Sequence, residues 1–216
     1  MQLLRDQIGR RVFPLHRLDK PTSGVLLFAL DADTAREVGG QFERNEIGKR
    51  YLAVVRGWPP EQGVIDHPLS RRFDDYGRKY TPGNEPEPLP ALTCFRRLAT
   101  IELPEAVERY PSTRYALVEL EPRSGRQHQL RRHMKHISHP IIGDANWGKG
   151  IHNRFFQRRF GCDRLLLACT FLSLRHPLDG HRLAIEAPPE PGFAAVASAL
   201  GWCLLPPEAT GEARTT

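Results

Sequence analysis

One carboxylate near the start of the chain has neighbours that would fix its position. Asp19 lies within the segment His16–Gly24, directly before the apolar run Val25–Leu30. The Pro, Ser and Gly residues of this segment favour a turn, and a turn residue beside a strand can meet a substrate while the strand holds it in place. Asp19 is therefore a candidate nucleophile. The alternative is that it only shapes the turn and pairs with Arg17 or Lys20 on the surface.

A second polar block, Gly125–His133, contains three arginines and two histidines. Leu130 and Met134 are four residues apart, which predicts a helix over residues 126–136 with one buried face, preceded by Ser124 as a cap. The arginines and histidines then cover the other sides of this helix. His128, His133, His136 and His139 lack a ligand spacing such as His-Glu-x-x-His, so we expect no metal site among these four.

The charge balance indicates a polyanionic partner. Thirty-one Lys and Arg residues against 25 Asp and Glu residues give a net charge of +6 and a pI near 9.4. Arginine suits phosphate because its planar guanidinium binds two oxygens at once and stays charged. The longest apolar run is far shorter than the roughly 20 residues of a membrane-spanning helix. The first residues also lack the features of a signal peptide. We therefore expect a cytoplasmic protein with no membrane partner, whose four cysteines are reduced and buried.

Apolar patterns and turn signals predict an α+β fold around a largely antiparallel mixed β-sheet, flanked by helices and loops. Asp31 predicts the start of a helix that ends near residues 45–48. The pair Asp179-Gly180 between two apolar runs predicts a β-hairpin. Strands are expected at residues 24–30, 49–57, 63–69, 91–103, 113–121, 165–174 and 181–187, and further helices at residues 154–160 and 193–200.

Several short motifs occur in one order along the chain, and together they resemble the RluA-type pseudouridine synthases. The motifs are His16–Asp19 with Thr22–Gly24, Lys49–Gly57, Gly125–Arg131 and His139–Asp144. A finer resemblance, carried by residues 97–102 and 110–122, is to a branch of this family that acts at uridine 65 of tRNA. The resemblance implies a pseudouridine synthase fold and the isomerisation of uridine in RNA to its C5-linked isomer, with no cofactor and no metal.

The resemblance also implies the catalytic residues. Asp19 matches the family's catalytic carboxylate, which forms a covalent adduct or assists glycal formation. Tyr51 matches the ring that stacks on the target base and helps to remove the C5 proton, although its free pKa of about 10 makes it a reluctant base. Arg131 matches the basic residue that pairs with the carboxylate. Without the resemblance, Tyr51 would be read as an ordinary strand aromatic.

Further positions are implied to contact RNA. Arg17 matches the arginine that fills the gap left by the everted nucleotide, and Leu167 matches a residue that packs under the uracil. The family often has His directly after that leucine, but here Ala168 follows, and Trp147 stands where the family has Tyr. Candidate RNA or phosphate contacts are Arg126, His128, Arg71, Arg72, Arg78, Lys79, Arg154, Arg158 and Arg159.

The expected organisation is a single catalytic domain over residues 1–205, without a separate N-terminal RNA-binding domain. The polar, Pro-rich segment 71–90 is expected to be a mobile insertion loop, and residues 206–216 a frayed tail. The expected partner is tRNA and the expected state is a monomer. Two alternatives stay open at this point. The same chemistry could act on large-subunit ribosomal RNA or on both RNAs, or the chain could be a basic RNA-binding module without catalysis.

Overall fold

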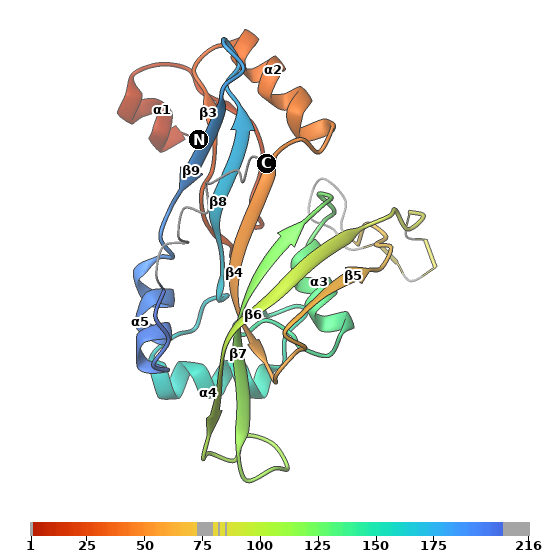
Figure 1. Ribbon diagram of the computed structural model, residues 1–216, viewed down its shortest axis with the longest axis vertical. Coiled ribbons are helices and arrows are strands. Elements are labelled where there is room, and N and C mark those ends of the chain that lie inside the picture. Colours follow the sequence, from red (N-terminus) through yellow and green to blue (C-terminus); the bar gives the residue numbers. More distant parts are fainter. Residues whose placement is uncertain (1, 73–79, 82, 85, 205–216) are drawn as a thin grey trace, which may run out of the picture.

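A long curved sheet forms the centre of the computed structural model, which describes residues 2–72, 80–81, 83–84 and 86–204 (Figure 1). In chain order the elements are α1 (Gln2–Ile8), β1 (Phe13–Pro14), β2 (Ser23–Gly24), β3 (Phe28–Ala29), α2 (Ala32–Glu43), β4 (Gly48–Arg56), β5 (Gln62–Asp66), β6 (Leu92–Leu103), β7 (Thr113–Pro122), α3 (Gln129–His136), α4 (Gly150–Phe160), β8 (Leu167–Arg175), β9 (Arg182–Glu186) and α5 (Pro191–Ala199).

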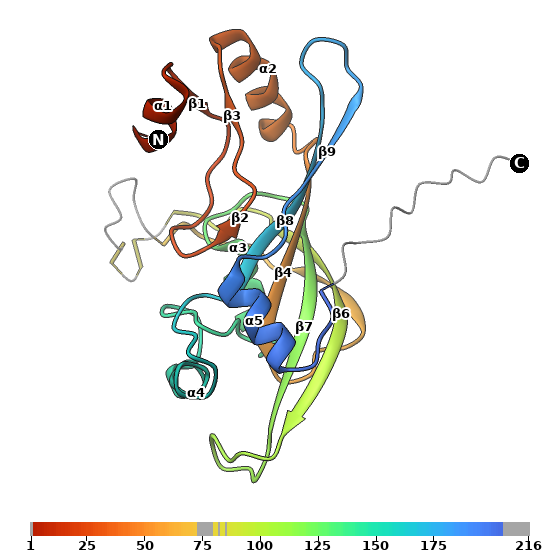
Figure 2. The ribbon, with the colours of Figure 1, turned by 90° about the vertical axis from the view of Figure 1, so that its left-hand side faces the viewer.

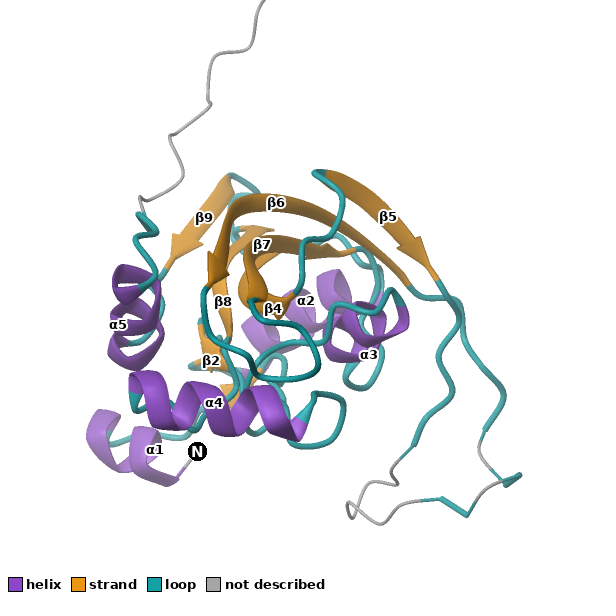
Figure 3. Ribbon diagram, turned by 90° about the horizontal axis from the view of Figure 1, so that it is seen from below, coloured by secondary structure: helices purple, strands orange, loops and turns teal. Residues whose placement is uncertain are grey.

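The main sheet of the described residues has seven strands in the order β2-β8-β4-β7-β6-β5, with β9 paired to β8. All of its pairs are antiparallel except β2 with β8, which is parallel. The sheet curves like an arch, with α3 within its curve (Figure 3). Figure 2 shows the sheet from its edge, with α2 near one end of the long strands. The predicted α+β class with a mixed, largely antiparallel sheet is confirmed.

The central strands β4 and β7 are covered on both faces, which explains their nearly continuous apolar sequence. On one face Val54 and Leu117 pack in a core that includes Phe156 of α4. On the other face Val55 and Leu120 belong to a core with residues of α3 and β8. Phe156 is fully buried, and burial of such a side chain stabilises a fold by about 1.5–3 kcal/mol. The sheet is therefore a rigid platform for residues at its surface.

The predicted helix after Asp31 is confirmed as α2. The Asp31 carboxylate accepts a hydrogen bond from the backbone N–H of Thr34 at 2.8 Å, which satisfies a free donor of the first turn. Val38 is buried on the inner face of this helix. The helix ends at Glu43, slightly before the predicted boundary. The predicted hairpin across Asp179-Gly180 is also present, as β8 and β9.

The prediction of one buried strand over residues 24–30 is wrong. Ser23 and Gly24 form β2 in the main sheet, whereas Phe28 and Ala29 form β3 in a separate sheet with β1. Leu26 is 41% exposed because it lies in the connection between the two sheets. An apolar run of this length does not reveal where the chain leaves one sheet for another.

The start of α3 also differs from the prediction. The helix begins at Gln129, and its N-cap residue is His128, which has a left-handed φ of 55° and no side-chain capping bond. Ser124 is not the cap, because its hydroxyl donates to the side-chain oxygen of Gln129 at 2.8 Å. The predicted buried face is confirmed, since Leu130 and Met134 are both buried.

Some predictions fall on residues that the structure does not describe. Leu69 and Leu89 form a β-bridge at the base of segment 71–90, but residues 73–79, 82 and 85 lie outside the described residues, as does the tail from residue 205. All four cysteines are free. The expectation that all are buried holds for Cys162 and Cys169 but is wrong for Cys203, which is exposed, and Cys94 is only half-buried. Among the described residues, no helix combines the length and apolar character needed to cross a membrane.

Candidate active site

The turn that carries Asp19 is held against the sheet by an unusually close backbone contact. The N–H of Thr22 donates to the carbonyl of Asp19 at 2.8 Å, which closes the predicted turn. Gly24 then lies so close to β8 that an added Cβ atom would be 2.0 Å from the carbonyl oxygen of Cys169, and its φ is +111°. Only glycine fits at such a position. The close contact therefore holds the Asp19 turn against β8.

Asp19 faces a cleft of about 920 Å³. The turn around Asp19 forms one wall, the residues at the start of α3 form the other, and side chains of β4 and β8 line it between them. Eight of the predicted site residues line this cleft, namely Arg17, Asp19, Tyr51, Arg71, Arg126, His128, Arg131 and Leu167. Residues more than 140 positions apart in the chain thus meet in one place, as the sequence analysis expected for an active site.

Arg131 connects two carboxylates at the base of the cleft. Its Nε and Nη2 donate to the two oxygens of Asp144 at 2.7 and 2.8 Å, and its Nη1 donates to Oδ2 of Asp19 at 3.2 Å. The bidentate pair with Asp144 fixes the plane of the guanidinium. Only one edge of the guanidinium is then directed at Asp19. The predicted pairing of Asp19 with Arg131 is present in the structure.

Burial makes this cluster electrostatically strong. The side chain of Arg131 is 3% exposed and that of Asp144 is fully buried, whereas Asp19 keeps 26% exposure toward the cleft. Burial disfavours the charge on Arg131, but the bonds to Asp144 and Asp19 raise its pKa above the ordinary value. Burial likewise acts against the charge of Asp144, yet the Arg131 bonds lower the pKa of this carboxyl. Both groups are therefore charged, and Asp19 is the one carboxylate of the three-residue cluster that a ligand can reach.

Asp144 was not predicted as a site residue, although its motif was noted. Its Oδ1 also accepts hydrogen bonds from the backbone N–H groups of Asn146 and Trp147, both at 2.9 Å. The preceding Gly143 has a φ of +79°, and an added Cβ would lie 1.8 Å from the carbonyl oxygen of Arg164. The Gly-Asp pair in His139–Asp144 was the available signal. Its pairing with Arg131 follows from the fold, because Arg131 lies in α3 and Asp144 in the loop that follows this helix.

His128 stands beside Asp19 as a neutral group. Burial lowers its pKa, and the neighbouring Asp19 carboxylate offsets this only in part. The indole N–H of Trp147 donates to Nδ1 of His128 at 3.1 Å, so the imidazole proton lies on Nε2. That Nε2 is 3.9 Å from Oδ1 of Asp19, beyond hydrogen-bond distance. Trp147, which stands where the family has Tyr, therefore orients His128.

Tyr51 is directed at the cleft by an irregularity in the sheet. The pairing of β4 with β8 shifts between Arg50 and Tyr51, so that Tyr51 lies opposite Cys169. Burial raises the pKa of Tyr51 well above its ordinary value, and the Cys169 thiol and the Asp19 carboxylate act in the same direction. The phenol is therefore protonated at neutral pH. Leu167, which is 2% exposed, lines the same cleft from β8.

Two further cleft residues were missed by the sequence analysis. Lys49 precedes Tyr51 by two residues and shares its strand, and burial lowers the pKa of its ammonium. Among the residues that the structure describes, no carboxylate forms an ion pair with Lys49. His16 stacks on Phe42 at 4.8 Å between ring centroids, and burial with the nearby Lys49 charge lowers its pKa to about 4. The neutral ring accepts the backbone N–H of Leu27 at 3.1 Å and so supports the Asp19 turn.

The remaining candidates for RNA contact are divided by the fold. Arg17 is exposed at the cleft, and Arg126 lines it while donating from Nε to the carbonyl of Pro90 at 3.0 Å. Arg72 lies next to Arg71 but does not line the cleft. Arg78 and Lys79 lie outside the described residues. The other three predicted arginines are on α4 and do not line the cleft; they are Arg154, Arg158 and Arg159, the last paired with Glu105.

Comparisons with known proteins identify the family of the chain. Residues 1–136 match a family model described as RNA pseudouridylate synthase, a span that includes Asp19, Tyr51 and Arg131. The chain is 47% identical to the tRNA pseudouridine synthase C of Pectobacterium carotovorum, over 98% of this chain and 56% of that protein. It is 46% identical to the protein of the same name from Vibrio cholerae, over 94% of this chain and 82% of that protein.

Solved structures give the same result. The human protein described as RNA pseudouridylate synthase domain containing 1 superimposes with a TM-score of 0.68 and 26% identity, covering 89% of this chain and 76% of that one. The human protein described as RNA pseudouridylate synthase domain containing 4 has a TM-score of 0.67 and 25% identity, covering 93% and 80%. The family model and the similar relatives show that the chain belongs to the RNA pseudouridylate synthase family.

Proposed function

We propose that this protein isomerises uridine to pseudouridine in tRNA, with the cleft around Asp19 as its active site. The observation that carries the proposal is the Asp19–Arg131–Asp144 cluster. It presents one accessible carboxylate, held by a buried guanidinium, to a cleft with space for a nucleotide. Cleavage of a glycosidic bond needs an anion beside the sugar and base, and this cleft supplies one in a fixed orientation.

The reaction rearranges bonds within one nucleotide. The N1–C1′ bond of uridine breaks, the uracil turns, and a C5–C1′ bond forms while C5 loses a proton and N1 gains one. In the proposed mechanism, the Asp19 carboxylate attacks C1′ or assists glycal formation, and both routes need it ionised. Arg131 is a positioning residue, because it orients the Asp19 oxygen and its own plane is fixed by Asp144.

Tyr51 and Leu167 would hold the uracil between them. Both line the cleft from neighbouring strands, and an aromatic ring with an aliphatic side chain suits the flat faces of a base. The raised pKa of Tyr51 supports a stacking role in the free enzyme rather than a phenolate base. Tyr51 could remove the C5 proton only if the bound substrate lowered the pKa of its phenol, so that the phenolate formed.

The target nucleotide must leave its stack, because C1′ and C5 are not accessible inside a helix. Eversion costs a few kcal/mol, and cations at the cleft would offset part of this cost by binding the backbone. Lys49 and Arg17 are suited to this role, since neither has an ion-pair partner among the described residues. Recognition would rest on RNA shape and phosphates, because A-form helices hide their major-groove edges.

The tRNA substrate is proposed from the relatives named tRNA pseudouridine synthase C, and uridine 65 from the resemblance of residues 97–102 and 110–122 to a tRNA-modifying branch. The chain spans 56% of the Pectobacterium relative, so the activity of that whole protein is extended here only as a proposal. We also expect a monomer that acts in the cytoplasm. Light scattering of the purified protein tests the first, and fractionation of cells tests the second.

The decisive experiment maps pseudouridines after incubating bulk unmodified tRNA and ribosomal RNA with the protein. The wild type is expected to form product in tRNA at position 65. Asp19→Asn is expected to form none while its RNA affinity stays largely intact. Asp33→Asn is the matched control, because Asp33 is an exposed carboxylate paired only with Arg36 within the described residues, and its activity should be unchanged.

Other outcomes of this experiment would overturn the substrate, the catalytic residue or the activity itself. Product confined to ribosomal RNA would overturn the tRNA substrate and keep the isomerase. Full activity of Asp19→Asn would exclude Asp19 as the catalytic carboxylate. RNA binding without product from any RNA would favour the non-catalytic RNA-binding module.

A further inference from the structure

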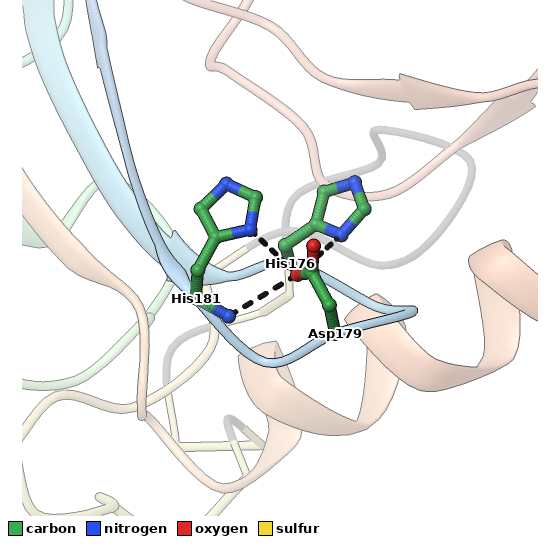
Figure 4. A group of neighbouring side chains, drawn as sticks. All are labelled: His176, Asp179 and His181. Carbon is green, nitrogen blue, oxygen red and sulfur yellow. Dashed lines mark hydrogen bonds and ion pairs between the residues drawn. The ribbon is translucent and has the colours of Figure 1, made fainter.

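A second cluster of ligand-type side chains lies at the end of the β8–β9 hairpin, outside the cleft. His176, Asp179 and His181 come from one turn, and their ligand atoms lie within 4.8 Å of one another. None of the three lines the Asp19 cleft. Figure 4 shows both imidazole rings on the same side of the turn, with a nitrogen of each directed at the Asp179 carboxylate.

The side chains of His176 and His181 both approach the Asp179 carboxylate. Oδ1 of Asp179 lies 2.9 Å from Nδ1 of His176 and 2.5 Å from Nδ1 of His181. The two rings are stacked at 4.7 Å between centroids and 20° between planes. Two imidazole nitrogens thus face one carboxylate oxygen, so three ligand-type atoms gather at one point of the turn. Imidazole and carboxylate are the ligands that borderline divalent cations such as Zn²⁺ prefer.

One of these atoms is left without a proper hydrogen bond. Nδ1 of His176 is buried and forms no hydrogen bond of acceptable geometry, even though Oδ1 of Asp179 is close to it. A buried polar atom without a partner is costly and calls for an explanation. A cation at the centre of the cluster would give this nitrogen a partner.

Hydrogen bonds hold the hairpin backbone, so the three candidate ligands are positioned before any metal binds. His176 N–H donates to the carbonyl of His181 at 2.8 Å, and Gly180 N–H donates to the carbonyl of His176 at 3.0 Å. Gly180 adopts the left-handed φ of +74° that this turn needs. Below the turn, the buried side chain of Gln41 in α2 bonds both the N–H and the carbonyl of Arg175, at 2.9 and 3.0 Å. The residue next to His176 is therefore tied to a helix.

We propose that His176, Asp179 and His181 form a binding site for Zn²⁺ or a similar first-row divalent cation, which clips the turn of the β8–β9 hairpin. The ligands would be Nδ1 of each histidine and one oxygen of Asp179, with water in the remaining position. Bonds of about 2.0–2.2 Å in a tetrahedral site separate ligand atoms by about 3.3 Å. The Asp179 oxygen would withdraw and the two imidazole nitrogens would turn toward the same point, which the exposed side chains of Asp179 and His181 permit.

The site is independent of the proposed isomerase activity, because it lies on a hairpin turn away from the cleft. The affinity should be moderate, since water reaches the site: the side chains of Asp179 and His181 are 61% and 55% exposed. Loss of a group that only hydrogen-bonds to a metal ligand already weakens metal binding by roughly 10- to 100-fold, so loss of one ligand should weaken Zn²⁺ binding by at least as much.

The test is a metal titration of the untagged, metal-stripped protein. Zn²⁺ binding is measured by calorimetry, and Co²⁺ is used as a spectroscopic probe of a low-symmetry nitrogen and oxygen site. All proteins carry Cys203→Ser, because the exposed thiol of Cys203 could bind the same ions. The variants are His176→Ala, Asp179→Asn and His181→Ala, and the matched control is Asp33→Asn, which removes an exposed carboxylate elsewhere.

We expect the parent protein and Asp33→Asn to bind one Zn²⁺ per chain with equal affinity, and each of the three ligand variants to lose at least tenfold in affinity. His181→Ala is the most direct variant, because His181 is exposed and its loss leaves the fold intact. Absence of saturable binding in the parent protein would overturn the proposal. So would unchanged Zn²⁺ affinity in His181→Ala.

Discussion

Two clusters in this molecule combine carboxylates with cationic or ligand-type side chains, and they are built in opposite ways. The Asp19–Arg131–Asp144 cluster joins residues that are 112 and 13 positions apart and buries Arg131 almost completely. The His176–Asp179–His181 cluster comes from one short turn, and two of its side chains are more than half exposed. The first is assembled by the whole fold, whereas the second is assembled by local turn geometry.

The difference shows what burial adds to a charge cluster. Around Arg131 every charge has a fixed partner, and further backbone N–H groups hold Asp144, so Asp19 receives a defined orientation. Around Asp179 water competes for the same oxygen, and exposed pairs contribute little to stability. The buried cluster should therefore be sensitive to any change, and the exposed one should respond only when a cation is present.

The largest expected effect follows from Asp144→Ala. Removal of one partner from a buried ion pair leaves the other charge uncompensated, which costs about 3–5 kcal/mol. We expect the free energy of unfolding in urea to fall by about this amount, and the activity of the folded fraction to fall as well. Asp163→Ala, at an exposed position, is the control and should leave unfolding unchanged. A stable, fully active Asp144→Ala variant would show that Arg131 does not need its anchor.

The next effect is expected from Arg131→Lys. Lysine keeps the charge but cannot bind Asp144 with two parallel bonds and Asp19 with a third. A displaced Asp19 should lower kcat by roughly 100-fold with little change in KM, because a shift of about 1 Å at a reacting group has this effect. The readout is single-turnover pseudouridine formation.

The neighbouring Arg132→Lys supplies the control for this variant. Arg132 donates to the carbonyl of Ser70 at 2.6 Å, and the structure records no contact between Arg132 and Asp19. Its kcat should stay close to that of the wild type. Equal losses in both variants would mean that helix α3 tolerates no change, and that the Asp19 contact has no special role.

A smaller effect is expected from Lys49→Met, which removes a cation from the cleft without touching Asp19. If Lys49 binds an RNA phosphate, the slope of log affinity against log salt concentration should decrease by about one. KM should rise while kcat changes little. Lys135→Met, on the exposed side of α3, is the matched control. Equal salt slopes for wild type and Lys49→Met would exclude a phosphate contact.

We expect Tyr51→Phe to leave the pH dependence of the reaction rate unchanged. Because burial raises the pKa of Tyr51 well above its ordinary value, the phenol does not ionise in the neutral range. The pH–rate curves of wild type and Tyr51→Phe should therefore have the same shape from about pH 6 to pH 9. An inflection found in the wild type and missing in the variant would indicate that Tyr51 ionises during catalysis.

Local signals predicted the local parts of this structure. The capping carboxylate of Asp31 marked the start of α2, and Asp179-Gly180 marked the turn between β8 and β9, because neighbouring residues decide both features. The run Val25–Leu30 misled the prediction, since an apolar run looks the same whether it stays in one sheet or crosses between two. Contacts with strands distant in the sequence decided which of these residues belong to which sheet.

The site was predictable only in part for the same reason. The pair of Asp19 with Arg131 was expected from the family resemblance, and residue spacing alone would not have given it. Asp144 was missed because nothing in the sequence connects it to Arg131 across the intervening loop. Lys49 was missed because a lysine two residues before a strand tyrosine looks like a solvated surface residue, and its burial depends on α2 and the Asp19 turn.

The smallest effect is expected from Asp179→Asn, and it sharpens the comparison of the two clusters. Without added metal, the unfolding midpoint of this variant should match the wild type, because an exposed pair contributes little. With increasing Zn²⁺, the wild-type Tm should rise, since a ligand that binds only the folded state stabilises it by mass action. The variant should not follow. A clear loss of stability in metal-free Asp179→Asn would show instead that the exposed cluster is held together as tightly as the buried one.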